Sequence, residues 1–175
     1  HPQLARPSPA SLRRRFAFSL PATHRAAGIS LTEGTLIGPL VAPLVEAAVA
    51  RGATGAALLE VLGVTRDELI DPDHRVPVAR VFAAWELATD ATGDASLPIV
   101  VGRQASIQRF GMLGYAVYTS ETVADAIAAL SRYHLLINDS GTWDVEARPE
   151  SVVVTWRRGG EPARGRRLAN EQALA

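Results

Sequence analysis

The sequence predicts an α+β fold in which a helical N-terminal half is followed by a helix and an antiparallel β-hairpin that contributes to a small sheet. Two observations support this class: apolar residues recur at helical spacing up to about residue 138, and the period changes to two between residues 142 and 157. The chain has 175 residues, 47% hydrophobic and 21% charged, which suits one domain with a sizeable core. We expect residues 1–34, rich in Pro, Ser, Ala and Arg, to form a flexible extension and residues 35–175 to form the domain.

The helical half begins with the most apolar run of the chain, residues 36–50. Glycine, two prolines and a glutamate interrupt this run, and it is shorter than the roughly 20 apolar residues of a membrane-spanning helix, so we expect a buried helix. Another helix is predicted to start near Pro77, because proline is favoured in a first turn, where its missing N–H costs nothing. The residues that this helix should bury are Val78, Val81, Phe82 and Trp85.

Residues 54–69 have the apolar pattern, turn glycine and second capped helix of a helix-turn-helix. The second helix, however, offers one arginine, Arg66, against four carboxylates in residues 67–73. Such a face would repel DNA phosphates, so the sequence favours a structural helical pair. The two aspartates, proline and histidine of residues 71–74 indicate a turn rather than a metal site, because no second ligand pair at suitable spacing accompanies them.

A second amphipathic helix is predicted to begin at Ser120, a natural N-cap, with Glu121 placing negative charge at the positive end of the helix dipole. Apolar residues then recur at helical spacing to about Asn138, so one wide face should be buried. This apolar stripe comprises Val123, Ala126, Ile127, Leu130, Tyr133, His134 and Ile137.

The β-hairpin is predicted from the alternation of apolar and polar residues on either side of a four-residue loop, residues 148–151. Since a two-stranded hairpin is not stable alone in water, its apolar face should cover the stripe of the preceding helix. With this loop length, the residues that pair and share that face are Trp143 with Trp156, Val145 with Val154, and Ala147 with Val152.

Charge and cysteine content exclude several function classes. The 18 basic and 18 acidic residues give a net charge of zero, so no whole-chain field attracts nucleic acid or anionic lipid. The chain has no cysteine, which excludes a disulfide framework, a thiolate nucleophile and Cys-based metal sites. We expect the basic patch near the C-terminus to be solvated charge, and it consists of Arg157, Arg158, Arg164, Arg166 and Arg167.

One segment carries a family resemblance. Residues 114–139, GYAVYTSETVADAIAALSRYHLLIND, resemble an element in the N-terminal effector domain of AraC-type transcriptional regulators, in the branch with a helical arabinose-binding-like domain rather than a cupin barrel. The upstream segments LVEAAVARGATGAALLEVLGVTRDEL and VARVFAAWELATDATGD fit the helical first half of the same domain. The resemblance therefore runs from about Leu40 to the C-terminus.

The resemblance implies a cytoplasmic bacterial module that binds a small-molecule effector and controls a C-terminal domain with two helix-turn-helix units, through which alone it would contact DNA. No such units follow in the sequence, and residues 164–175 show helical spacing without a stop signal, so we interpret the chain as a fragment that also lacks the last strands of its domain. A truncated sheet leaves an unpaired edge, so we expect self-association, such as a dimer. The alternative is a free-standing small-molecule-binding or protein-interaction module.

The predicted ligand contacts are polar or aromatic groups beside the apolar stripe, because pockets combine apolar walls with a few polar groups. They are Tyr115, Tyr118, Tyr133, His134 and Asn138. For His134 the alternative is a core histidine bonded to a backbone carbonyl. No nucleophile with its base emerges, so we expect no enzymatic activity, and the sequence implies neither a cofactor nor a metal.

Overall fold

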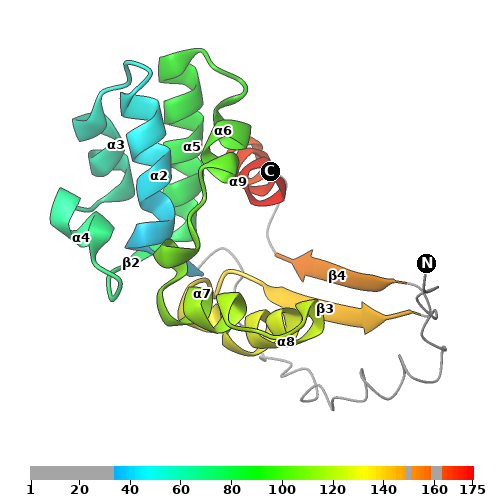
Figure 1. The fold of residues 1–175 in the computed structure, drawn as a ribbon. Helices are drawn as coiled ribbons and strands as arrows, with labels where there is room; N and C mark the ends of the chain where they lie inside the picture. The colour runs from blue at the N-terminus through cyan, green and yellow to red at the C-terminus, as the bar shows by residue number, and fades with distance from the viewer. Residues whose placement is uncertain (1–33, 149–150, 159–162) are drawn as a thin grey trace, which may run out of the picture.

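A computed structural model of the protein describes residues 34–148, 151–158 and 163–175 (Figure 1). The predicted flexible extension lies outside this range, except for Gly34. The described elements confirm the α+β class, since they are mostly helices with two antiparallel two-stranded sheets. None of the described helices combines the length and the apolar character needed to cross a membrane.

The described elements fall into two parts (Figure 1). We call the first the helical body, and it comprises β1 (Thr35–Ile37), α2 (Gly38–Val49), α3 (Gly55–Leu62), α4 (Arg66–Ile70), β2 (Arg75–Pro77), α5 (Val78–Thr92), α6 (Leu97–Arg103) and α9 (Arg164–Leu174). We call the second the hairpin arm, and it comprises η1 (Ile107–Phe110), α7 (Gly111–Tyr118), α8 (Val123–Tyr133), η2 (His134–Leu136), β3 (Thr142–Ala147) and β4 (Val152–Arg157).

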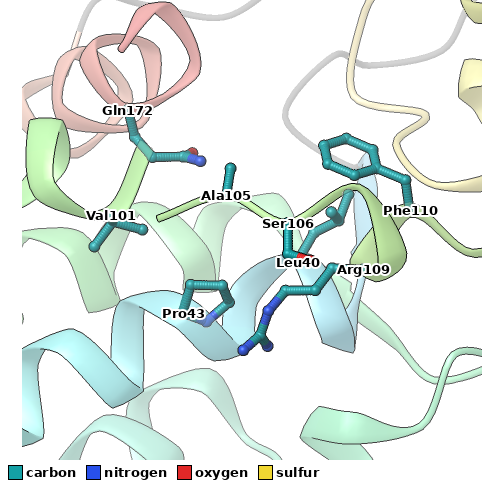
Figure 2. A pocket seen from close by; sticks show the side chains of 8 residues that line it. All are labelled: Leu40, Pro43, Val101, Ala105, Ser106, Arg109, Phe110 and Gln172. Atoms are coloured by element: carbon teal, nitrogen blue, oxygen red, sulfur yellow. The ribbon is translucent and has the colours of Figure 1, made fainter. Parts of the chain in front are cut away.

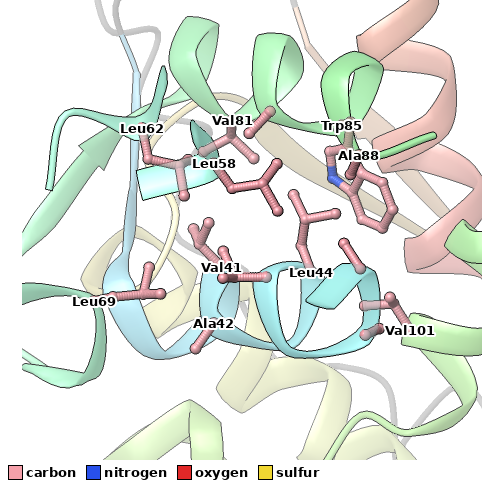
Figure 3. Close-up of a cluster of buried hydrophobic side chains, with 14 of the residues drawn as sticks. Val41, Ala42, Leu44, Leu58, Leu62, Leu69, Val81, Trp85, Ala88 and Val101 are labelled. Atoms are coloured by element: carbon pink, nitrogen blue, oxygen red, sulfur yellow. The ribbon is translucent and has the colours of Figure 1, made fainter. Parts of the chain in front are cut away.

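The helical body has one continuous core around α2, which contacts α3, α4, α5 and α6 (Figure 3). The predicted buried helix at residues 36–50 is confirmed: α2 carries a proline in its first turn and buries most of its side chains, Leu44 among them. The predicted helix after Pro77 is also confirmed. It buries Val78, Val81 and Trp85, whereas Phe82 is only half-buried.

The helix-turn-helix-like segment forms the predicted pair of helices. The turn glycine, Gly63, has a left-handed backbone with φ of 68°, which lets α3 end and the chain turn into α4. Thr65 and Glu68 form a capping box at the start of α4, and these hydrogen bonds from Thr65 hold the pKa of Glu68 below its ordinary value. Leu58 and Leu69 bury the pair in the main core, and α4 has only five residues.

The C-terminal helix α9 returns to the helical body and packs on α5 and α6. The approach is close at Gly165, where a Cβ would overlap the carbonyl oxygen of Phe82. The Gly165 N–H donates to Glu86 Oε1 at 2.7 Å, and Arg164 binds both carboxylate oxygens of Asp90. The helical spacing predicted for residues 164–175 therefore corresponds to a docked helix.

The predicted start of the amphipathic helix at Ser120 is wrong by two residues. The helix α8 begins at Val123, and its N-cap is Thr122, whose Oγ1 accepts from the Asp125 N–H at 3.1 Å. The Ser120 hydroxyl instead donates to the Ala116 carbonyl oxygen at 2.8 Å, so it belongs to the C-terminal end of α7. Both residues are able to cap, and the end of the preceding helix decides which of them does.

The apolar stripe is less buried than predicted. No residue of α8 is fully buried, Val123 at its start is 77% exposed, and the helix ends at Tyr133 rather than near Asn138. Burial is achieved at the far end, where His134 and Ile137 are covered. The two-stranded hairpin is too small to cover the whole stripe.

The hairpin register is confirmed. Trp143 pairs with Trp156 and Val145 with Val154, and the Arg148 N–H donates to the Ser151 carbonyl oxygen at 2.8 Å across the four-residue loop. β3 contacts α8, as expected for a hairpin that cannot stand alone. The sheet contains only β3 and β4 among the described residues.

The strand β1 joins the two parts of the molecule. On one side it pairs with β2, and on the other its Ile37 N–H donates to the Ile137 carbonyl oxygen at 3.0 Å. Arg75 on β2 binds Thr35 Oγ1 at 2.6 Å and Asp139 at 3.3 Å, and Asp139 also accepts from Thr35. This small polar network fixes the end of η2 to the helical body.

Candidate functional site

The apolar face of the hairpin carries two tryptophans, and His134 lies against one of them. The ring centroids of Trp143 and Trp156 are 4.9 Å apart, and the His134 ring meets Trp156 edge-on at 5.8 Å with an interplanar angle of 86°. His134 begins η2 and is only 8% exposed. The fold therefore places an imidazole at the inner side of the hairpin.

The two ring nitrogens of His134 differ in their surroundings. Nδ1 lies 3.1 Å from the Ser131 carbonyl oxygen, and since a carbonyl only accepts, Nδ1 carries the proton. Nε2 is buried and has no hydrogen-bond partner among the described residues. The first contact is the one expected of a core histidine, and the second atom remains available for another polar contact.

The other predicted ligand contacts are distributed over different surroundings. Asn138 Oδ1 already accepts from the N–H and hydroxyl of Ser140. Tyr115 and Tyr118 lie on α7 and are 66% and 78% exposed, and Tyr133 is also exposed. Tyr133 precedes His134 in the chain, but the fold leaves all three tyrosines exposed. Their contact with a ligand stays a prediction.

Arg158, which follows β4, is not the solvated charge that the sequence predicted. Its guanidinium carbon lies 5.2 Å from the Phe82 ring centroid and 5.7 Å from that of Trp156. Its Nε and Nη1 atoms are buried and have no hydrogen-bond partner among the described residues. Burial, together with the nearby Arg166, lowers the pKa of Arg158 to about 10.

Two other arginines of the basic patch are also engaged. Arg157 binds Asp144 on the opposite strand, and Arg164 binds Asp90 on α5. The alternation of the strand was the available signal for Arg158, because a residue two positions after Trp156 continues on the same face. The presence of Phe82 beside it follows from the return of α9 to α5 and was not readable from the sequence.

A shallow pocket lies between α2, α6, η1 and α9 (Figure 2). Its cavity volume is only about 20 Å³, far below the roughly 300–1,000 Å³ of common ligand pockets. Its charged lining residue, Arg109, is bound to Glu46 at 2.8 Å. The lining residues are Leu40, Pro43, Val101, Ala105, Ser106, Arg109, Phe110 and Gln172, none of which was a predicted ligand contact.

Metal ligation has no basis in the described part of the chain, where no group of three or more His, Cys, Asp or Glu side chains is placed to hold an ion. Among the described residues, the buried side-chain nitrogen and oxygen atoms without a hydrogen-bond partner belong to His134 and Arg158, and both side chains lie against Trp156.

Comparison with known proteins gives a family match. Residues 52–175 match the family described as the arabinose-binding domain of AraC transcription regulator, N-term. No curated protein matches the chain. The matched span covers all of the hairpin arm and the helical body from α3 onward, and therefore contains both His134 and Arg158.

Proposed function

Because this chain belongs to the family of arabinose-binding N-terminal domains of AraC transcription regulators, we propose that it binds a small metabolite and thereby controls an attached helix-turn-helix DNA-binding domain. The observation that carries this proposal is the family match over residues 52–175. The role is regulatory and non-catalytic. The domain acts in the cytoplasm, where its operator DNA lies.

The two-part architecture supports a mechanism of coupling. The hairpin arm is held to the helical body through β1, its network with Arg75 and Asp139, and a small apolar cluster. A ligand that binds one arrangement of arm and body more tightly than another shifts the population towards that arrangement. An attached DNA-binding domain that prefers the same arrangement is then biased by an equal coupling free energy.

Self-association belongs to this proposal. Met112, Tyr115 and Tyr118 are spaced by three along α7, so they share one face, and all three are strongly exposed. Exposed apolar faces of this kind mark interaction surfaces. A second copy of the domain is the partner that we propose for α7.

The test uses the full-length protein that contains this chain. Operator binding is measured by fluorescence anisotropy with and without a panel of metabolites, and a ligand that acts through this domain should shift the apparent affinity for the operator. The chain alone should show no salt-sensitive binding to duplex DNA, since the α4 face is acidic. Specific DNA binding by this chain, or operator affinity that no metabolite changes, would contradict the proposal.

A further inference from the structure

The strongest unexplained feature outside the apolar cores is the setting of the Arg158 guanidinium. It lies between Phe82 of α5 and Trp156 of β4, at distances of 5.2 and 5.7 Å from the two ring centroids. Aromatic faces attract a cation, but they satisfy none of the N–H groups of a guanidinium. The buried Nε and Nη1 donors have no acceptor within the described residues.

Three carboxylates, one on β3 and two on α5, are engaged elsewhere in the described part of the chain. Asp144 binds Arg157 on the other face of the hairpin, Asp90 binds Arg164, and Glu86 Oε1 accepts from the Gly165 N–H. The charged group that acts on the Arg158 guanidinium is another cation, Arg166. Arg166 also donates to the Arg158 carbonyl oxygen at 3.0 Å.

A buried cation without an anionic partner costs free energy, and its surroundings favour the entry of a negative charge. His134 also contacts Trp156, and its buried Nε2 likewise lacks a partner in the described chain. In the tautomer whose Nδ1–H donates to the Ser131 carbonyl oxygen, Nε2 is an acceptor, so it suits a hydroxyl or amine of a ligand.

We propose that the effector of this domain carries a carboxylate that binds Arg158, with its apolar part against the rings of Phe82 and Trp156 and with His134 Nε2 as a second polar contact. This inference rests on the proposed function and names the ligand class and the residues that recognise it. Because Phe82 belongs to the body and Trp156 to the arm, such a ligand would bridge the two parts. That position is suited to the coupling described above.

The surroundings favour a carboxylate over a phosphate. A phosphate dianion is normally held by several cations or by converging backbone N–H groups, whereas Arg158 is flanked by two apolar rings. A planar carboxylate needs fewer donors and leaves the apolar walls free to contact the rest of the ligand. Inorganic phosphate therefore serves as a competing probe in the test.

The experiment measures binding of phenylacetate, phenylacetamide and inorganic phosphate to the full-length protein by titration calorimetry. The amide has the shape of the acid without its charge. Phenylacetate should bind at least tenfold more tightly than the amide or phosphate, and Arg158→Met should weaken it by roughly tenfold to a hundredfold, the usual effect of losing a hydrogen bond to a charged group. Arg158→Lys should restore part of the affinity.

The matched control is Arg157→Met, which removes a charge from the next residue on the opposite face and should leave phenylacetate binding unchanged. Without ligand, Arg158→Met should melt at the same temperature as the wild type or higher, because it removes an uncompensated buried charge. A clear fall in that temperature would assign Arg158 a structural role and overturn the inference.

The remaining outcomes separate this inference from the proposed function. If a metabolite shifts operator binding equally in the wild type and in Arg158→Met, the carboxylate site is wrong and the regulatory role stands. If phosphate binds as tightly as phenylacetate, the ligand class is wrong. If no ligand binds and operator affinity never responds, both fail together.

Discussion

The helical body and the hairpin arm are stabilised to very different degrees. Among the described residues, the body has one cluster of 19 buried apolar residues, whereas the cluster that anchors the arm has three. The exposed aromatic and apolar side chains of α7, α8 and η2 lie in the arm. Elements with little buried apolar surface open at lower free energy than the global core, and ligand-dependent motions are drawn from such elements. The body therefore supplies most of the stability, and the arm is the part that a ligand is expected to move.

The largest expected effect tests the body directly. Leu44→Ala removes a side chain that is 2% exposed at the centre of the main core and should lower the free energy of unfolding by about 2–5 kcal/mol. Leu113→Ala in the cluster of the arm should cost less, because the arm is able to open locally. Urea denaturation followed by tryptophan fluorescence measures both losses. Equal losses of free energy, together with equal hydrogen-exchange protection of α2 and α8, would show that the arm is as stable as the body.

A second prediction concerns the docking of α9 on the body. Gly165→Ala places a methyl group against the Phe82 carbonyl and should destabilise the protein by about 1–3 kcal/mol through overpacking. The control is Gly55→Ala at the start of α3, where the added Cβ meets a single methyl group of the exposed Val49 at 3.1 Å and no backbone atom, so the change should cost far less than Gly165→Ala. Thermal melting compares the two. A stabilising Gly165→Ala would mean that α9 docks loosely.

Self-association should depend on the surface of the arm and not on that of the body. Replacing Met112 and Tyr118 on α7 by serine should shift the protein towards monomer, because both side chains are strongly exposed and apolar or aromatic. Ile70→Ser on α4 is the control in the body, since Ile70 is an exposed apolar residue outside the α7 face. Light scattering over a wide concentration range reports the mass. A wild-type protein that stays monomeric at all concentrations would contradict the proposed interface on α7.

The smallest effect is expected at the rim of the body. Hydrogen bonds from Arg164 hold the pKa of Asp90 below its ordinary value of 3.8, so their stabilisation is present above that pH and is lost as pH falls through the lower folded pKa. Asp90→Asn should therefore melt slightly earlier than the wild type at neutral pH. The difference should shrink below pH 3.8 and vanish in stronger acid. A difference that persists in acid would show that the carboxylate charge is not its cause.

Local patterns predicted the elements better than the surfaces. Loop length and alternation were sufficient for the Trp143–Trp156 register, because an antiparallel hairpin of known loop length has one pairing that keeps both apolar sets on one face. The helix after Pro77 and the structural pair of α3 and α4 followed from capping chemistry and apolar spacing. These features are decided within a few residues.

The fold class, the helices after residue 36 and after Pro77, the hairpin register and the family resemblance were determined by the sequence alone. Only the tertiary structure decided that Thr122 rather than Ser120 caps α8, that the tyrosines of α7 face solvent, and that the guanidinium of Arg158, with two buried nitrogen atoms, lies beside Phe82. The physical reason is that capping and periodicity act between neighbours in the chain. Burial depends on which distant element covers a face, and here the return of α9 to α5 brings a ring and a guanidinium together from 76 residues apart.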